Sequence, residues 1–171
     1  MRPALTVLGI DPGTAVCGFG VISAAAGRRA SLVECGVVRT RAADALPVRL
    51  LQIADAVTEL VQRHRPDVLA LENVFLGSNA RSALILGHAR GAIMLSAARA
   101  GVPVAEISPR EVKAAVAGSG AAQKHQVGEM VARLLHLAAP PRPADAADGV
   151  AIALTHVLRA MPRTRLAVGL R

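Results

Sequence analysis

The sequence predicts an α/β domain built on a five-stranded mixed sheet with helices on both faces. Three short β-rich runs come first, and helical and strand-like segments then alternate along the 171-residue chain. Three strands in succession are typical of an antiparallel start, whereas strand–helix–strand units add parallel strands. The expected order is three strands, a helix, a strand, a helix, a strand and three helices.

Each predicted strand is a short apolar run that stops at a turn signal or a polar residue. The first ends at the turn Asp11-Pro12-Gly13, and the run VLAL ends at Glu72. A continuous apolar run of that kind is typical of a strand covered on both faces. The five expected strands span residues 6–10, 19–22, 32–39, 68–71 and 102–107.

The predicted helices follow from apolar residues at helical spacing and from capping signals. Residues 108–111, SPRE, match a capping box with proline at the first helical position. The helix over 82–100 is rich in Ala, Gly and Ser, which permits close approach of another helix. The other expected helices span residues 47–63, 123–137 and 144–160. We expect one domain over residues 1–160 and a basic tail over 161–171.

The chain is strongly basic, with 20 Lys and Arg against 12 Asp and Glu, a net charge of +8 and a pI near 11.3. Such a field favours polyanions and speeds their encounter. Only two aromatic residues are present, Phe19 and Phe75, so stacking platforms for single strands are essentially missing. The composition therefore favours binding to the backbone of duplex nucleic acid.

Neither a membrane span nor a secretory signal is expected. No apolar run approaches the roughly 18 residues that a transmembrane helix needs, and the apolar stretch at the start turns directly into an acidic turn. Cys17 and Cys35 lack the close spacing of a zinc or redox pair. We expect a soluble, cytoplasmic protein with two reduced thiols.

Four acidic residues occupy positions suited to chemistry. Asp11 follows the first strand, Glu72 follows the fourth, and Asp145 and Asp148 share one face at the start of the last helix. Each also has a structural explanation: aspartate favours turns, glutamate at a strand end reaches solvent, and acidic residues suit a helix N-terminus.

Taken together, the four carboxylates are hard oxygen ligands of the type that Mg²⁺ or Mn²⁺ prefers. Two such ions can activate a water molecule and stabilise the leaving oxygen when a phosphodiester is hydrolysed. Combined with the basic charge, this predicts a metal-dependent DNA nuclease that uses two Mg²⁺ (or Mn²⁺) ions in each active site.

Four blocks resemble a known family: GIDPGT at 9–14, ALENVF at 70–75, NARSALILGHARG at 79–91 and ADAADGVAIALTH at 144–156. They are similar to the RuvC family of bacterial Holliday junction resolvases, the crossover junction endodeoxyribonucleases. The resemblance implies an RNase H-like fold and a homodimer that nicks four-way junction DNA symmetrically in recombination and repair. It implies the branch-migration proteins RuvA and RuvB as partners. It also implies an acidic quartet of Asp11, Glu72, Asp145 and Asp148.

Further site residues are implied by the same resemblance. Lys113 and Lys124, the only lysines in the chain, match basic residues that flank the scissile phosphate. Phe75 matches an aromatic residue of a DNA-contacting loop, where it would wedge against a base. Asn79 and Arg81 belong to the same stretch and would contact bases or phosphates.

Two residues near the carboxylates have more ordinary interpretations. His156 follows Asp148 by two helical turns, and we expect a core histidine rather than a metal ligand. Gly149 departs from the DAADA pattern that is usual in the family, and glycine lowers helix propensity by roughly 1 kcal/mol relative to alanine, less in a first turn.

Three alternatives remain at the level of sequence. An actin-like or sugar-kinase-like ATPase also begins with a strand and an Asp-x-Gly-Thr turn, but it needs a second such turn, which this chain lacks. An RNase H-like nuclease that matures ribosomal RNA has similar carboxylates, but the segment around Phe75 and the block at 144–156 argue against it. A non-catalytic DNA-structure binder would not need all four acids.

Overall fold

Five strands form one mixed sheet in the order β3-β2-β1-β4-β5. The structure, a computed structural model, describes residues 4–25, 29–73 and 80–161. Strand β1 pairs antiparallel with β2 and parallel with β4, β2 pairs antiparallel with β3, and β4 pairs parallel with β5. The predicted mixed sheet, with an antiparallel start and parallel additions, is confirmed. The strands are β1 (Leu5–Asp11), β2 (Val16–Ala24), β3 (Ser31–Arg39), β4 (Val68–Glu72) and β5 (Val104–Ile107).

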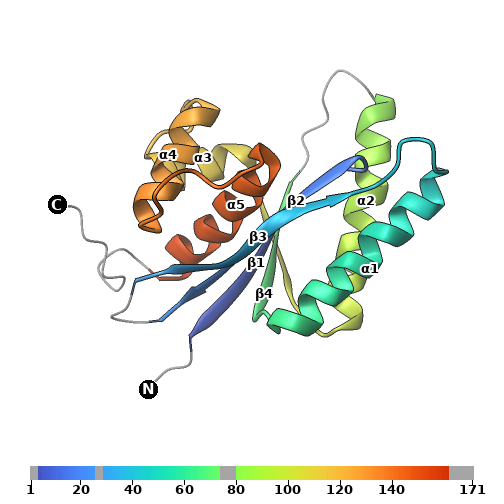
Figure 1. Cartoon of the computed structure of the whole chain (residues 1–171), viewed down its shortest axis with the longest axis horizontal. Coiled ribbons are helices and arrows are strands. Elements are labelled where there is room, and N and C mark those ends of the chain that lie inside the picture. Colours follow the sequence, from blue (N-terminus) through green and yellow to red (C-terminus); the bar gives the residue numbers. More distant parts are fainter. Residues whose placement is uncertain (1–3, 26–28, 74–79, 162–171) are drawn as a thin grey trace.

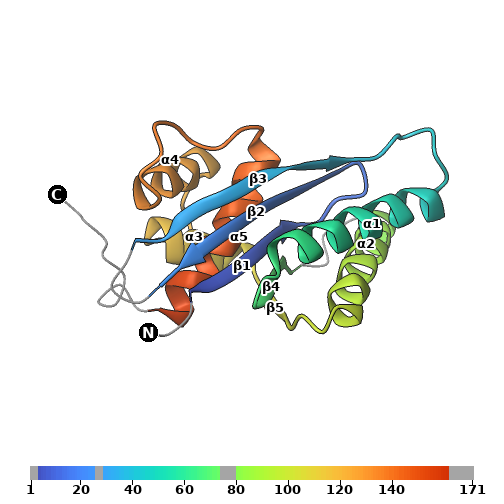
Figure 2. The ribbon, with the colours of Figure 1, turned by 60° about the horizontal axis from the view of Figure 1, so that its bottom comes forward.

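Helices cover both faces of the sheet, as Figures 1 and 2 show. Two helices pack together on one face, and three lie on the other (Figure 1). None of the described helices combines the length and apolarity that a membrane span requires. On the first face lie α1 (Leu46–His64) and α2 (Ala80–Arg99), and on the second lie α3 (Pro109–Ala117), α4 (Lys124–Leu134) and α5 (Ala144–Ala160).

The predicted elements differ from the observed ones only at their ends. The capping box of α3 is present, with the Ser108 hydroxyl accepting from the Glu111 amide and the Glu111 carboxylate accepting from the Ser108 amide. Helix α4 ends three residues earlier than predicted, because His136 adopts a left-handed backbone with φ 54°. Division of the chain into one domain over 1–160 and a tail over 161–171 stays a prediction, since residues 162–171 lie outside the described part.

Helix α5 lies unusually close to the backbone of β1 and β2. Gly9 of β1 is paired in register with Gly20 of β2. A Cβ atom added to Gly9 would lie 2.3 Å from the Gly149 carbonyl oxygen of α5, and one added to Gly18 would lie 1.9 Å from the Asp145 carbonyl oxygen. These distances are too short for any side chain, so glycine is required where the helix rests on the strands.

The helix contributes its own glycine to this contact. A Cβ atom added to Gly149 would lie 2.6 Å from the backbone of Phe19 in β2. At the level of sequence Gly149 is only a cost in helix propensity. In the structure it removes the atom that would hold the first turns of α5 away from the sheet.

Replacing one of the strand glycines tests this contact. We expect Gly9→Ala to lower the free energy of unfolding by about 1–3 kcal/mol or more, because an added methyl group in a fully packed contact forces a backbone shift. The matched control is Gly128→Ala in α4, where the added Cβ would lie 3.7 Å from Pro140, an ordinary contact. That change should raise stability by up to about 1 kcal/mol through helix propensity. Urea unfolding of both variants is the measurement, and equal stability of the two would contradict the close packing.

Candidate metal centre

Strand alternation places Asp11 and Glu72 on the same face of the sheet. Along β1, Leu8 and Ile10 pack toward α1 and α2, whereas Val7 packs toward α5. Asp11 has the same parity as Val7 and therefore faces α5. Along β4, Val68 and Ala70 also pack toward α5, so Glu72 follows them onto that face. Because β1 and β4 are parallel neighbours, their carboxyl ends present both acids at one edge.

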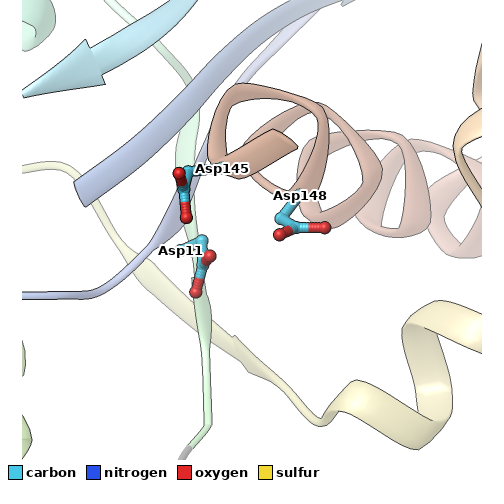
Figure 3. A group of neighbouring side chains, drawn as sticks. All are labelled: Asp11, Asp145 and Asp148. Carbon is cyan, nitrogen blue, oxygen red and sulfur yellow. The ribbon is translucent and has the colours of Figure 1, made fainter. Parts of the chain in front are cut away.

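The start of α5 brings two more acids to this edge. Asp145 lies in the first turn of α5 and Asp148 one turn later. Figure 3 shows Asp11 and Asp145 close together, with Asp148 beside them. Carboxylate oxygens of Asp11, Asp145 and Asp148 all lie within 4.8 Å of one another, and in the described part of the chain they form the only such group of potential metal ligands. Glu72 joins this group through a hydrogen bond with the Asp11 carboxyl group.

Burial and like charge make the carboxylates hard to ionise together. Burial, together with the neighbouring Glu72 and Asp148 carboxylates, raises the pKa of Asp11 to about 8. Burial is also the main cause of the raised pKa values of Glu72 and Asp148. The hydrogen bond with Lys124 acts in the opposite direction on the pKa of Asp148. Half-buried oxygen donors that repel one another are suited to a hard divalent cation.

Both lysines of the chain lie beside the carboxylates. The Lys124 ammonium donates to the Asp148 carboxylate over 2.5 Å, and this hydrogen bond is the main cause of the raised pKa of Lys124. Lys113 lines the same cavity of about 460 Å³ as Asp11 and Glu72. A second cavity, of about 960 Å³, shares Lys124 and Asp148 with the first. The centre is therefore a hollow that contains both anionic and cationic groups.

The remaining candidate residues have different outcomes. Arg81 is exposed in the first turn of α2 and does not line the carboxylate cavity. Phe75 and Asn79 lie outside the described residues. His156 is half-buried, and burial, followed by the charge of Arg159, lowers its pKa. It belongs to neither the carboxylate group nor the lining of the carboxylate cavity.

Sequence reasoning missed one residue at the edge of this centre. Arg90 of α2 is 11% exposed and donates to the Glu72 carbonyl oxygen and to the Glu106 carboxylate. A signal was available: Arg90 is the only Lys or Arg between Arg81 and Arg99, in a helix otherwise composed mainly of small and apolar residues. A lone cation on such a helix predicts a buried partner.

Comparison with known proteins decides the family. The family model described as "Crossover junction endodeoxyribonuclease RuvC" matches residues 7–156. The chain belongs to the RuvC family. The crossover junction endodeoxyribonuclease RuvC of Salinispora arenicola is 51% identical over 95% of this chain and 93% of its own length. The RuvC of Parafrankia sp. is 49% identical over 98% of this chain and 95% of its own length.

Solved structures agree with this assignment to the RuvC family. A T. thermophilus RuvC in complex with a Holliday junction substrate matches with a TM-score of 0.86 and 39% identity, over 91% of this chain and 94% of that one. The yeast mitochondrial Holliday junction resolvase Ydc2 matches with a TM-score of 0.64 at 14% identity, over 90% and 79% of the two chains, which shows the shared fold alone. The RNase H-like fold implied by the sequence blocks is confirmed.

The raised pKa of Asp11 predicts how the metal-free protein responds to pH. A carboxyl group whose pKa rises from its ordinary 3.8 to about 8 on folding binds its proton more tightly in the folded protein. Its contribution to stability is therefore complete below pH about 4 and lost as the pH rises to about 8. We expect the Tm of the metal-free protein to fall over that range.

A divalent cation should reverse this loss. Mg²⁺ or Mn²⁺ binds only the folded arrangement of carboxylates and should raise the Tm most at the upper end of the pH range, where the proton no longer competes. Differential scanning fluorimetry with chelator or with metal measures both effects. The control is Asp11→Asn, which removes this titration; an unchanged pH profile in that variant would contradict the assignment to Asp11.

Proposed function

We propose that this chain is a structure-selective endonuclease that resolves four-way DNA junctions by hydrolysing phosphodiester bonds in paired, symmetric nicks. The observation that carries the proposal is the meeting of Asp11, Glu72, Asp145 and Asp148 at one sheet edge beside Lys113 and Lys124. Support comes from the RuvC relatives, of which one is solved with a Holliday junction substrate. Recombination and repair of DNA are the processes that such an enzyme serves.

The four carboxylates would hold two Mg²⁺ or Mn²⁺ ions. The described donors are all oxygen, with no sulfur or imidazole among them, which favours these hard cations. When bound, the ions supply an activated water molecule and stabilise charge on the oxygens of the phosphate. The protein's contribution is to fix the donors: Asp11 and Glu72 on parallel strands, and Asp145 and Asp148 on a helix packed against the sheet.

The two lysines would hold the scissile phosphate against this centre. Lys124 pairs with Asp148 over 2.5 Å, and 67% of its side chain is exposed, so its ammonium can also face a phosphate oxygen arriving from solvent. Lys113 lines the same cavity. An ammonium is a compact point charge with rotatable donors, which suits a phosphate that must be held without a fixed fork geometry.

Binding of the junction would depend on the basic surface as a whole. The net charge of +8 favours a polyanion, and affinity should fall steeply with salt as counterions are released. Phe75, Asn79 and Arg81 are proposed contacts to the bases or phosphates at the junction centre. Delivery of the junction by RuvA and RuvB in the bacterial cytoplasm is part of the same proposal and rests on the family alone.

A homodimer would supply two such centres for symmetric nicks. Helix α2 turns a stripe of small and apolar residues to solvent, with Leu84 64% and Leu95 53% exposed. Between them, a Cβ added to Gly87 or Gly91 would have no neighbour within 4 Å among the described residues outside the helix's own backbone. This open, small-residue stripe fits the same stripe of a second copy, and a two-fold interface pairs one patch with itself.

Synthetic junctions test the activity. The wild-type protein with Mg²⁺ or Mn²⁺ should nick four-way junctions in symmetric pairs and leave linear duplex largely intact. Asp148→Asn and Glu72→Gln should abolish cleavage, since each removes a ligand charge, whereas junction binding should persist or tighten because repulsion of the phosphates is reduced. Gel assays of cleavage and binding measure both effects.

The matched control is Asp55→Asn, an exposed acid on α1, which should cleave like the wild type. Retained cleavage in either ligand variant would remove that residue from the metal centre. Equal cutting of structured RNA, or ATP hydrolysis without cutting, would overturn the proposed substrate.

The dimer surface can be tested separately. Gly91→Leu should yield a monomer in light scattering, because an added Cβ has no neighbour within 4 Å in the described part of the chain, while the larger side chain blocks close approach of a second α2. Leu84→Asp should have the same effect by burying a charge in the interface. The control is Val33→Asp on β3, where a valine is 52% exposed. A dimer that survives both α2 changes places the interface elsewhere.

A further inference from the structure

Arg90 makes contacts that join three elements at the edge of the metal centre. Its guanidinium leaves α2, donates to the carbonyl oxygen of Glu72 at the end of β4, and donates to the carboxylate of Glu106 on β5. Only 11% of the Arg90 side chain is exposed. A charge that is largely buried requires partners that satisfy it, and here both are groups of the sheet.

The end of β4 needs such a donor because its pairing is incomplete. Parallel pairing of β1 with β4 runs from Val7–Val68 to Ile10–Leu71 and stops one residue before Glu72. On the other side, Glu72 is in register with Ile107 of β5, and the Asn73 amide donates to the Ile107 carbonyl over 2.8 Å. Arg90 supplies a donor to the Glu72 carbonyl, which lies beyond the ladder with β1.

We infer that Arg90 is a positioning residue that fixes the backbone of Glu72, and with it the direction in which the Glu72 carboxylate meets the metal centre. The inference rests on the proposed function in that it assigns Glu72 to metal binding. Glu106 acts as the second anchor: by accepting from the same guanidinium it prevents the arginine side chain from swinging away. Two simultaneous donors in a fixed plane are a property of arginine that lysine lacks.

The placement of Arg90 also links α2 to the active centre. The outward stripe of α2 contains Leu84, Gly91 and Leu95, whereas its inward side contains buried Ala89 and Ile93 with Arg90 beside them. A change in the position of α2 relative to the sheet is therefore transmitted to Glu72 through one side chain. Through Arg90, the position of α2 would therefore affect the position of Glu72.

Substitution of Arg90 tests the inference through metal affinity. We expect Arg90→Met to weaken Mn²⁺ binding to the protein, measured by calorimetry, by about 10- to 100-fold, the usual cost of losing a partner that orients a metal ligand. The Mn²⁺ concentration for half-maximal junction cleavage should rise by a similar factor. The KM for junction should stay unchanged and kcat at low Mn²⁺ should fall. Arg90→Lys should recover part of the loss, because an ammonium can still donate but cannot hold both acceptors in a fixed planar geometry.

Two further variants separate positioning from charge and from folding. Arg99→Met removes the same charge from an exposed position on the same helix and should bind Mn²⁺ like the wild type. Glu106→Gln leaves Arg90 in place but weakens its anchor, and should shift Mn²⁺ affinity in the same direction by a smaller factor. Glu106→Gln reports on the contact even if Arg90→Met does not fold.

The outcomes distinguish the inference from the proposed function. Wild-type Mn²⁺ affinity in folded Arg90→Met, or equal losses in Arg90→Met and Arg99→Met, would overturn the positioning role. So would a loss of cleavage that follows Tm and is independent of Mn²⁺ concentration. If the wild type cuts no junction while its Mn²⁺ affinity still depends on Arg90, the proposed substrate fails and the positioning role stands.

Discussion

The contact between α5 and the backbone of β1 and β2 is the constraint on which the metal centre depends. Gly9, Gly18 and Gly149 lack side chains at the closest points of this contact, so the backbone of the helix approaches the backbone of the strands there. The same contact carries Asp145: its carbonyl oxygen occupies the space that a Cβ of Gly18 would need. Since carboxylates must lie within a few ångströms of one another to share a cation, a helix held at the ordinary distance from a sheet would leave the Asp11 end of the centre incomplete.

The sheet positions the other two acids, through the alternation of side chains along β1 and β4 and the parallel direction of these strands. Asp11 and Glu72 end parallel neighbouring strands and share the face that α5 covers, so the sheet itself brings their carboxyl groups within hydrogen-bonding reach of each other. Bringing like charges together in a half-buried site lowers the stability of the folded protein. The same burial and repulsion raise the pKa of Asp11 to about 8. The apolar cores on both faces of the sheet offset that cost. This division, with stability supplied by the cores and strain held at the sheet edge, is typical of functional sites.

Sequence patterns are sufficient to predict the strands, their order along the chain and the four acidic residues. They are not sufficient to predict the contacts that bring these acids together. Strand ends at Asp11 and Glu72 follow from apolar runs, and parity then fixes their face. By contrast, Gly149 reads as a weakness of the helix until the backbone of Phe19 is seen against it. Arg90 lies 18 residues from Glu72 in sequence, and no local pattern indicates which carbonyl it reaches. Long-range contacts between backbone atoms leave little trace in the sequence. Glycine is the exception, but a glycine can be required at a position for many other reasons.

Charge balance at the metal centre explains why a cationic side chain, Lys124, lies beside the carboxylates. Without metal, the Asp11 carboxyl group binds a proton up to pH about 8, and Lys124 neutralises part of the charge on Asp148. A divalent cation must displace that proton, so affinity for metal should increase as the pH approaches 8 from below. Lys124 lines the same cavity as Asp148, and a cation that binds the Asp148 carboxylate would release the Lys124 ammonium from its present partner. In the proposed function it would then be available to a phosphate, so that one side chain would stabilise the centre before metal binds and attract the substrate afterwards.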